Sequence, residues 1–226
     1  MGKLTYAASV MCANLMRLET DLSSLETAQC DELHFDIMDG FFVPNITLGL
    51  DFVRAAKSVC SLPCNAHLMI RDAGRYLDRF VDAGSDSITL HLEAGGHLHR
   101  NLMRIREAGV SPGIAINPAT PLTKLDYLLD HVDRVLMMTV DPGYAGQKII
   151  PSAFERVRIL KENLDHRKLK TRIEVDGNIS VTNAAKLANA GATIFVLGTA
   201  SIFQGGDPGE ALSEFRRAVD AKRLCL

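Results

Sequence analysis

Short β-branched or aliphatic runs alternate with longer amphipathic segments along the whole chain, and this alternation restricts the fold more than any other feature. Short apolar runs favour strands, whereas apolar residues that recur every three or four positions favour helices. Strands are predicted at 6–11, 32–39, 65–70, 87–91, 113–116, 134–139, 172–175 and 193–197. Helices are predicted at 14–28, 50–58, 76–83, 98–108, 122–129, 153–163, 182–190 and 208–222.

Eight units of strand then helix follow one another with no linker, internal repeat or low-complexity tract. This pattern favours a closed (β/α)8 barrel of the TIM type. An open, doubly wound sheet is the alternative that the same alternation permits, but eight units favour closure. The length of 226 residues also fits, because such barrels commonly run to about 200 to 250 residues. We therefore expect residues 1–226 to form a single (β/α)8 barrel domain of the α/β class.

Charge and cysteine content argue against several classes of protein. The formal net charge is −2 with both signs mixed and no Lys/Arg stripe, so we expect no nucleic-acid partner. No apolar run approaches the roughly 20 residues that span a bilayer, and the first residues lack a signal-peptide pattern, so we expect a cytoplasmic protein without a membrane partner. The five cysteines show no Cys-x-x-Cys spacing, which argues against a disulfide framework and a cysteine zinc site.

The stretch 32–45 contains the most informative predicted strand. Within it, aliphatic and aromatic residues alternate with His34, Asp36 and Met38, so one face carries reactive groups and the other packs. A parallel strand is normally buried on both faces, so His34 and Asp36 need partners, and a divalent cation would satisfy both. For an isolated His-x-Asp, a hydrogen-bonded core pair is the alternative. The turn Asp39-Gly40 places this polar face at the C-terminal mouth of the strand.

Side chains at the C-terminal ends of barrel strands converge on one mouth. The residues that reach this mouth from the predicted strands are Ser9, His34, Asp36, Met38, His67, Met69, Met138, Asp141, Glu174 and Asp176. Two imidazoles and two carboxylates among them suit one zinc, manganese, iron(II) or cobalt ion; these are His34, Asp36, His67 and Asp176. His91 also ends a strand, where it would support the site or pack. Glu174 should lie deeper in the barrel, in a salt bridge or hydrogen bond.

Loops that contain glycine follow the last three predicted strands, at 141–147, 176–178 and 198–201. Glycine lets backbone amides approach an anion closely. The loops after the seventh and eighth strands, with the start of a short helix there, form the recurrent phosphate site of this architecture. Any one of these glycines could equally mark a turn with positive φ. The three loops together predict a phosphate ester as the ligand.

Seven short segments form an ordered set that spans most of the chain. They are Ser9-Val10-Met11, His34-Phe35-Asp36-Ile37-Met38-Asp39-Gly40, Phe42-Val43-Pro44-Asn45, Ala66-His67-Leu68-Met69, Asn117-Pro118-Ala119-Thr120-Pro121, Val140-Asp141-Pro142-Gly143-Tyr144-Ala145-Gly146-Gln147 and Glu174-Val175-Asp176-Gly177. This set resembles the ribulose-5-phosphate 3-epimerase family. Because several motifs match in order, chance similarity is negligible.

The resemblance implies a barrel of the ribulose-phosphate-binding type and a metal-dependent ketose-phosphate 3-epimerase, an isomerase of carbohydrate metabolism. It implies that one divalent metal ion is bound by the residues His34, Asp36, His67 and Asp176. Asp36 and Asp176 would also be the catalytic acid/base pair that moves the proton at carbon 3 through an enediolate. The implied contacts to the sugar and its phosphate come from Ser9, His67, Met38, Met69, Met138, Gly143, Tyr144, Ala145, Gly146, Gly177, Asn178, Gly198 and Thr199. We also expect a homo-oligomer.

Some positions depart from the commonest pattern of this family. Tyr144 and Ala145 stand where Phe and Gly are usual, Asn178 replaces a glycine, and the loop after the eighth strand is one residue longer. The pair Met11-Cys12, Ala145 and the longer loop resemble the allulose-6-phosphate 3-epimerase branch. We expect interconversion of D-ribulose 5-phosphate and D-xylulose 5-phosphate, a step of the pentose phosphate pathway. The alternative is conversion of D-allulose 6-phosphate to D-fructose 6-phosphate.

Two other functions are compatible with the same barrel. A lyase or decarboxylase would be expected to place a lysine near the carboxylates, and no lysine ends a predicted strand. A catalytically silent sugar-phosphate sensor should have lost at least one of the four ligand residues, and all four are present. Both functions are therefore less consistent with the sequence than a 3-epimerase.

Overall fold

Pairing between β1 (Thr5–Ser9) and β2 (Glu32–Asp39) closes a sheet of eight parallel strands in the computed structural model, which describes residues 3–225. The strand order is β1-β9-β8-β7-β6-β5-β4-β2. The remaining barrel strands are β4 (Cys64–Met69), β5 (Ser87–His91), β6 (Ser111–Ile116), β7 (Arg134–Met138), β8 (Arg172–Asp176) and β9 (Ile194–Leu197). The predicted (β/α)8 barrel is therefore confirmed, and the open doubly wound sheet is excluded.

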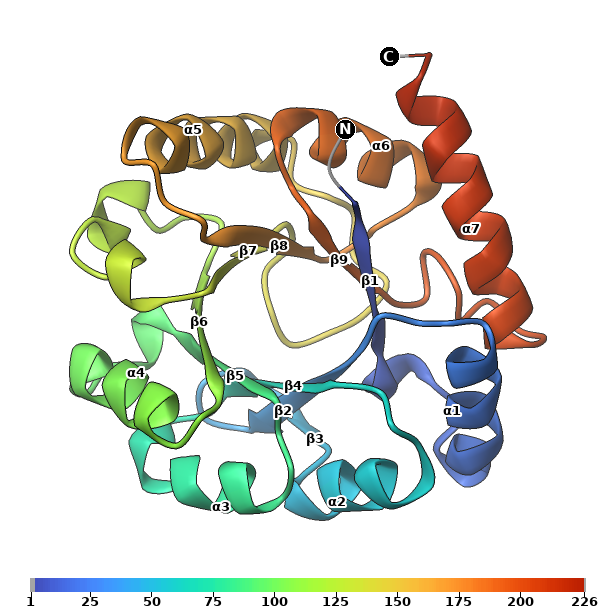
Figure 1. Ribbon diagram of the computed structural model, residues 1–226, viewed down its shortest axis with the longest axis horizontal. Coiled ribbons are helices and arrows are strands. Elements are labelled where there is room, and N and C mark those ends of the chain that lie inside the picture. The colour runs from blue at the N-terminus through green and yellow to red at the C-terminus, as the bar shows by residue number, and fades with distance from the viewer. Residues whose placement is uncertain (1–2, 226) are drawn as a thin grey trace.

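Helices form an outer layer around this barrel, as Figure 1 shows. They are α1 (Leu18–Thr27), α2 (Leu50–Val59), α3 (Leu77–Asp82), α4 (Leu98–Glu107), α5 (Ser152–His166), α6 (Val181–Ala190) and α7 (Pro208–Arg223). Buried apolar side chains from both layers pack between strands and helices, including Phe35, Leu102 and Phe195. The main hydrophobic core thus surrounds the barrel. A second, smaller apolar cluster lies on the opposite face of β6, β7 and β9, inside the barrel, and consists of Ala115, Leu136, Met138 and Val196.

The predicted helix at 122–129 is wrong. This segment instead forms two short 3-10 turns, Leu122–Leu125 and Leu129–His131. The carbonyl of Asp126 accepts a hydrogen bond from the Arg167 guanidinium, and the carbonyl of Leu129 accepts one from the Thr171 hydroxyl. These side chains satisfy backbone groups that an α-helical ladder would otherwise use. Eight residues are also too few for a helix to be stable without packing.

Two further differences lie around the first two strands. β1 ends at Ser9 and continues into 3-10 turns, and α1 begins at Leu18 rather than at residue 14. The Asn14 side chain accepts a hydrogen bond from the Met16 amide, which caps the second turn. A short strand, β3 (Ile46–Thr47), pairs antiparallel with the end of β2. It holds the loop that follows β2 against the barrel mouth.

Charged residues fill the barrel interior near the N-terminal ends of the strands. The Arg134 guanidinium contacts both carboxylate oxygens of Glu32, and its Nη1 lies 3.1 Å from Glu174 Oε2. All three side chains are buried. Gly113 makes room for this layer, because a Cβ there would lie 2.8 Å from Arg134 Cγ and 2.4 Å from Thr89 Oγ1. We call Glu32, Arg134 and Glu174 the basal charge layer.

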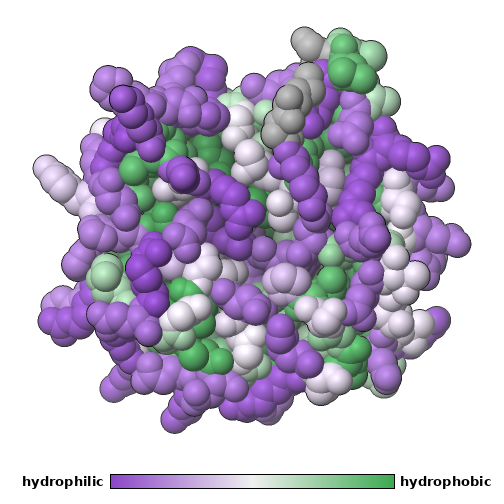
Figure 2. Space-filling view, in the orientation of Figure 1, coloured by the Kyte–Doolittle hydropathy of each residue, from purple (hydrophilic) through white to green (hydrophobic). Residues whose placement is uncertain are grey.

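Hydrophilic residues cover most of the face seen in Figure 2, and hydrophobic ones show mainly in the gaps between them. Within residues 3–225, no helix is long and apolar enough to cross a membrane.

Candidate metal and active site

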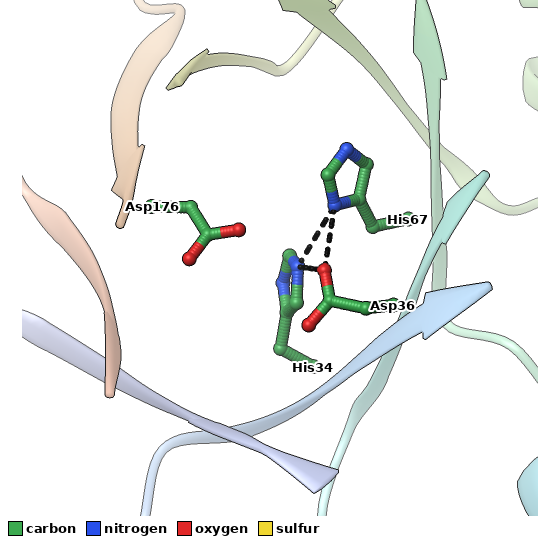
Figure 3. Close-up of side chains that lie close together, drawn as sticks. All are labelled: His34, Asp36, His67 and Asp176. Carbon is green, nitrogen blue, oxygen red and sulfur yellow. Dashed lines mark hydrogen bonds and ion pairs between the residues drawn. The ribbon is translucent and has the colours of Figure 1, made fainter. Parts of the chain in front are cut away.

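Four predicted ligand residues meet at the C-terminal mouth of the barrel: His34, Asp36, His67 and Asp176 (Figure 3). One nitrogen or oxygen atom from each lies within 4.8 Å of the others. Asp36 Oδ1 is 3.0 Å from His67 Nδ1 and 3.3 Å from His34 Nε2, and these two nitrogens are 3.2 Å apart. The Asp176 carboxylate faces this group from β8. We call these four residues the mouth cluster.

The sheet register explains why residues so distant in sequence meet. Asp36 pairs with His67 across β2 and β4, so their side chains leave neighbouring strands on the same face. His34 precedes Asp36 by two residues and therefore points to the same side. Asp176 is the last residue of β8, on the other side of the barrel.

Opposite pKa shifts distinguish the two carboxylates of the mouth cluster. Burial and then repulsion from Asp36 raise the pKa of Asp176 to about 8. Burial would also raise the pKa of Asp36, but the adjacent His34 and His67 imidazoles lower it below its usual range. Without a bound cation, one carboxyl is therefore ionised at neutral pH while the other holds a proton; a divalent cation would lower the pKa of both. This is the pairing that proton transfer between two carboxyl groups requires.

The donor set of the mouth cluster fits a divalent metal ion. Imidazole nitrogens and carboxylate oxygens together suit zinc, manganese, iron(II) or cobalt. His34, Asp36 and His67 are buried and Asp176 is partly buried, and the cluster contains no lysine or arginine to balance its carboxylates. A divalent cation among these four atoms would supply that charge. The residues present therefore fit the expected ion.

Each histidine of the mouth cluster has a partner on its outer side. His34 Nδ1 lies 3.1 Å from Glu174 Oε1, so the expected deeper salt bridge of Glu174 is confirmed. His67 Nε2 lies 2.8 Å from His91 Nε2, a contact that is consistent with the first of the two roles predicted for His91. Ser9 Oγ donates a hydrogen bond of 2.9 Å to Asp36 Oδ2.

A cavity of about 600 Å³, including its open mouth, lies beside the cluster. The predicted sugar and phosphate contacts that line it are Ser9, Met38, Met69, Met138, Gly143, Tyr144, Ala145, Gly146, Gly177, Asn178, Gly198 and Thr199, together with Asp36 and Asp176. His67 is fully buried and does not line it. Sequence reasoning did not assign Gln147 or Val196 to the site, although both line it. Gln147 is the last residue of the motif at 140–147, so the motif could have predicted its place in the site. Val196 has no such motif and is known only as a residue of a predicted strand.

Two loops meet across the mouth of this cavity. Asn45 Nδ2, in the loop after β2, donates a hydrogen bond of 2.8 Å to the carbonyl of Gly143, in the loop after β7. The Tyr144 hydroxyl donates to the carbonyl of Pro44. These contacts bring the two loops together over the side of the cavity that Gly143 and Tyr144 line.

The loop after β8 has the tight backbone that close approach to an anion needs. Gly177 has a φ of +114°, and a Cβ there would lie 2.6 Å from the Val140 side chain, so only glycine fits. Asn178, where glycine is usual, has a left-handed φ of +53°, which asparagine tolerates. Its side chain donates to the Gln147 carbonyl and accepts from Asn183. The expected short helix after β9 is absent from residues 198–206, which form turns.

Fold and site together define a TIM-barrel protein with a buried His/Asp cluster beside a cavity edged by glycine loops. Residues 5–203 match the ribulose-phosphate 3 epimerase family. The chain belongs to that family and is an epimerase, an enzyme of the isomerase class.

Curated relatives cover most of the chain. It is 39% identical over 214 residues to the ribulose-phosphate 3-epimerase of Bacillus subtilis, with 94% of this chain and 98% of that protein covered. It is 37% identical over 217 residues to the Escherichia coli protein of that name, with 96% of each chain covered.

Solved structures of low sequence identity share the fold. A protein named KGPDC from Streptococcus mutans has a TM-score of 0.73 at 14% identity, with 97% of this chain and 99% of that one covered. A tryptophan synthase alpha-subunit from Pyrococcus furiosus has a TM-score of 0.65 at 18% identity, with 99% and 98% covered. These two likenesses support the barrel alone.

Proposed function

We propose that the protein is a metal-dependent ketose-phosphate 3-epimerase that interconverts D-ribulose 5-phosphate and D-xylulose 5-phosphate. The observation that carries this proposal is the presence of Asp36 and Asp176 in one cavity, with His34 and His67 completing a metal-ligand set. Relatives that bear the name ribulose-phosphate 3-epimerase support the pentulose substrate.

The metal would be held by Nε2 of His34, Nδ1 of His67 and one carboxylate oxygen each of Asp36 and Asp176, the atoms that face one another. When bound, such an ion would polarise the ketone carbonyl and offset the negative charge of the enediolate. Zinc, iron(II), manganese and cobalt all fit this donor set, and the proposal extends to each of them.

Inversion at carbon 3 requires removal of a proton from one face of the substrate and delivery of a proton to the other. Asp36, with its lowered pKa, acts as the base toward one face. Asp176, which faces the cluster from β8, supplies a proton to the opposite face. In the reverse direction the two carboxyl groups exchange these roles.

The rest of the cavity positions the substrate and limits side reactions. Met38, Met69 and Met138 line it with apolar, polarisable groups that exclude water without offering a competing proton. Ser9 holds Asp36 by its hydrogen bond and lines the cavity, so it is assigned to the sugar. His67 does not line the cavity and keeps only its role as a metal ligand. Backbone amides of the loops at 143–146, 177–178 and 198–199 are assigned to the phosphate. No lysine is among the described residues that line the cavity, which disfavours a lyase.

D-Allulose 6-phosphate is the alternative substrate. Met11 and Cys12, which resemble the hexulose branch, both line the cavity, and Gly198 lies close to the Cys12 thiol, because a Cβ there would be 3.1 Å from Sγ. Substitution at these positions could alter the space for the sugar chain. The ratio of kcat/KM for the two ketose phosphates decides between them, and a much higher value for the hexulose phosphate would replace the pentulose assignment.

Two experiments test the mechanism. Treatment with a chelator should abolish turnover, and zinc, manganese, cobalt or iron(II) should restore it; full activity in verified metal-free protein would refute metal dependence.

Epimerisation in deuterated water should place deuterium on carbon 3 of the product, because two separate carboxyl groups exchange with solvent. A product that retains the substrate's own hydrogen at carbon 3 would argue for a single mobile acid.

Three further expectations stay predictions: a single domain, a homo-oligomer and a cytoplasmic location. Limited proteolysis, light scattering of the purified protein and microscopy of the tagged protein would check them in turn.

A further inference from the structure

His67 uses its two ring nitrogens in different directions. Nδ1 faces the mouth cluster, 3.0 Å from Asp36 Oδ1 and 3.2 Å from His34 Nε2. Nε2 faces away from the cluster and lies 2.8 Å from Nε2 of His91. Both imidazoles are fully buried, so water does not compete for these nitrogens. The position of the His67 proton therefore depends on its protein partners.

The two imidazoles share one hydrogen bond. Their ring centroids are 4.9 Å apart and their planes differ by 25°, whereas the two nitrogens are only 2.8 Å apart. The rings therefore meet edge to edge, with the nitrogens between them. One of these nitrogens must donate and the other accept, since two lone pairs or two protons at this distance would repel.

Glu93 determines which of the two Nε2 atoms, that of His67 or that of His91, accepts the shared hydrogen bond. Its Oε2 lies 3.3 Å from His91 Nδ1, and a carboxylate at this position can only accept. Its Oε1 already accepts from the Asn117 amide at 2.8 Å and from the Thr120 hydroxyl. Burial opposes ionisation, but the hydrogen bonds from His91, Thr120 and the Asn117 amide lower the pKa of Glu93 to about 2. The carboxylate is thus ionised and places the His91 proton on Nδ1.

We propose that Glu93 and His91 form a positioning chain that holds the proton of His67 on Nε2 and so keeps the Nδ1 lone pair directed into the mouth cluster. Because His91 carries its proton on Nδ1, its Nε2 can only accept, which favours donation from Nε2 of His67. Asp36 Oδ1, 3.0 Å from His67 Nδ1, competes for the same proton until a cation occupies the mouth cluster. The chain runs from the loop after β5 through the buried ring of His91 to β4. Neither Glu93 nor His91 lines the cavity, so neither touches the substrate.

The purpose of such a chain is to prepare His67 as a metal ligand, so the inference rests on the proposed metal site. A ligating imidazole must present an unprotonated nitrogen, and the partner of its other nitrogen fixes the tautomer and ring orientation. Loss of such a partner typically weakens metal binding by about 10- to 100-fold. His34 has the corresponding partner in Glu174, but with a direct carboxylate contact in place of an intervening histidine.

The tautomers can be measured by NMR. With ¹⁵N-labelled histidine, long-range ¹H–¹⁵N correlation spectra should show the His91 proton on Nδ1 in chelator-treated protein. In zinc-loaded protein they should show the His67 proton on Nε2 and the His91 proton on Nδ1. In Glu93→Gln the His91 assignment should become mixed, because an amide can also donate to Nδ1. A wild-type His91 that carries its proton on Nε2 alone would overturn the proposal, whether or not the protein binds metal.

Metal affinity provides the second measurement, by competition of Mn²⁺ between the protein and a chelating dye. His91→Gln, whose side-chain carbonyl reaches about as far as Nε2, should bind Mn²⁺ within a few-fold of wild type, whereas the shorter His91→Asn should bind about 10- to 100-fold more weakly. His97→Gln is the matched control on an exposed histidine. Equal affinity of His91→Asn and wild type would overturn the proposal. Failure of the wild type itself to bind Mn²⁺ would refute the metal site, and the tautomer spectra would then decide on the chain alone.

Discussion

Glu174 and Asp176 project from the same face of β8, two residues apart, yet their pKa values shift in opposite directions. Burial alone would raise both. Next to Glu174, the Arg134 guanidinium and His34 overcome this effect and lower the pKa of Glu174 to about 2. At Asp176, burial and then repulsion from the Asp36 carboxylate outweigh the effect of His34, and the pKa rises. For these two buried carboxyl groups, the charge on the neighbouring side chains therefore determines the direction of the pKa shift, whereas burial alone does not.

The basal charge layer and the mouth cluster divide stability and activity between them. In the basal layer, one guanidinium contacts two carboxylates and His34 contacts the second of them, so each carboxylate has a partner within the chain. In the mouth cluster two carboxylates face each other, and within these four residues only the imidazoles can carry positive charge. A layer in which a permanent guanidinium holds the carboxylates is suited to holding the barrel together, whereas carboxylates among imidazoles are suited to binding a cation and moving a proton.

The largest expected effect comes from the mouth cluster. Asp176→Asn removes one acid/base group, so kcat should fall by about 10²- to 10⁴-fold in protein shown to retain its metal. The free energy of unfolding of the metal-free variant should not fall, because burial and Asp36 disfavour an ionised Asp176 in the folded state, whereas asparagine is neutral in both states. Steady-state kinetics and urea denaturation measure the two quantities. Near wild-type turnover by the metal-loaded variant would show that Asp176 is not an acid/base group.

In the basal charge layer, substitution should instead lower the free energy of unfolding. Arg134→Met leaves Glu32 and Glu174 buried without their cation, which should lower the free energy of unfolding by about 3 to 5 kcal/mol. Urea denaturation of the purified variant measures this loss.

A double variant sharpens the same test. Glu32→Gln added to Arg134→Met removes one of the stranded charges, and the double variant should be more stable than Arg134→Met alone. If Arg134→Met unfolds at the wild-type urea concentration, the basal charge layer does not stabilise the barrel.

Glu174 joins the two regions, since one oxygen contacts Arg134 and the other contacts His34. Glu174→Gln keeps the size and shape of the side chain but replaces the charged contact to His34 Nδ1 with a weaker, neutral one. Metal affinity should therefore fall by about 10-fold, the lower end of the range for loss of such a partner. Mn²⁺ competition measures this change, with Glu155→Gln on exposed α5 as a control. Unchanged affinity in Glu174→Gln would show that the two regions act independently.

Local patterns in the sequence predicted most of the barrel. Alternation of polar and apolar residues located β2 and β4, and this same alternation placed His34, Asp36 and His67 on the interior face. The segment 122–129 was predicted as a helix because its leucines have helical spacing. Its carbonyls bond to Arg167 and Thr171, which lie about 40 residues later, and no local pattern contains that information.

The mouth cluster was predictable because strand ends converge in any barrel of this type. The positioning chain could not be predicted in this way, because it depends on which ring nitrogen of each histidine makes each contact and not on the residue types alone. His91 was recognised as a strand-end residue, but its contact with His67 through Nε2 and with Glu93 through Nδ1 follows from ring orientation. Likewise, the left-handed backbone of Asn178 becomes visible only with the loop in place.

Closure of the sheet by β1 has a consequence for synthesis on the ribosome. β1 lies between β2 and β9, so its second neighbour is made only when residues 194–197 appear. Asp176 likewise follows His67 by 109 residues in the sequence. At about 5 to 20 residues per second, the nascent chain carries three ligand residues for roughly 5 to 20 seconds before the fourth emerges. During that interval β1 presents an open edge, which makes this period the one in which the chain most needs protection from aggregation.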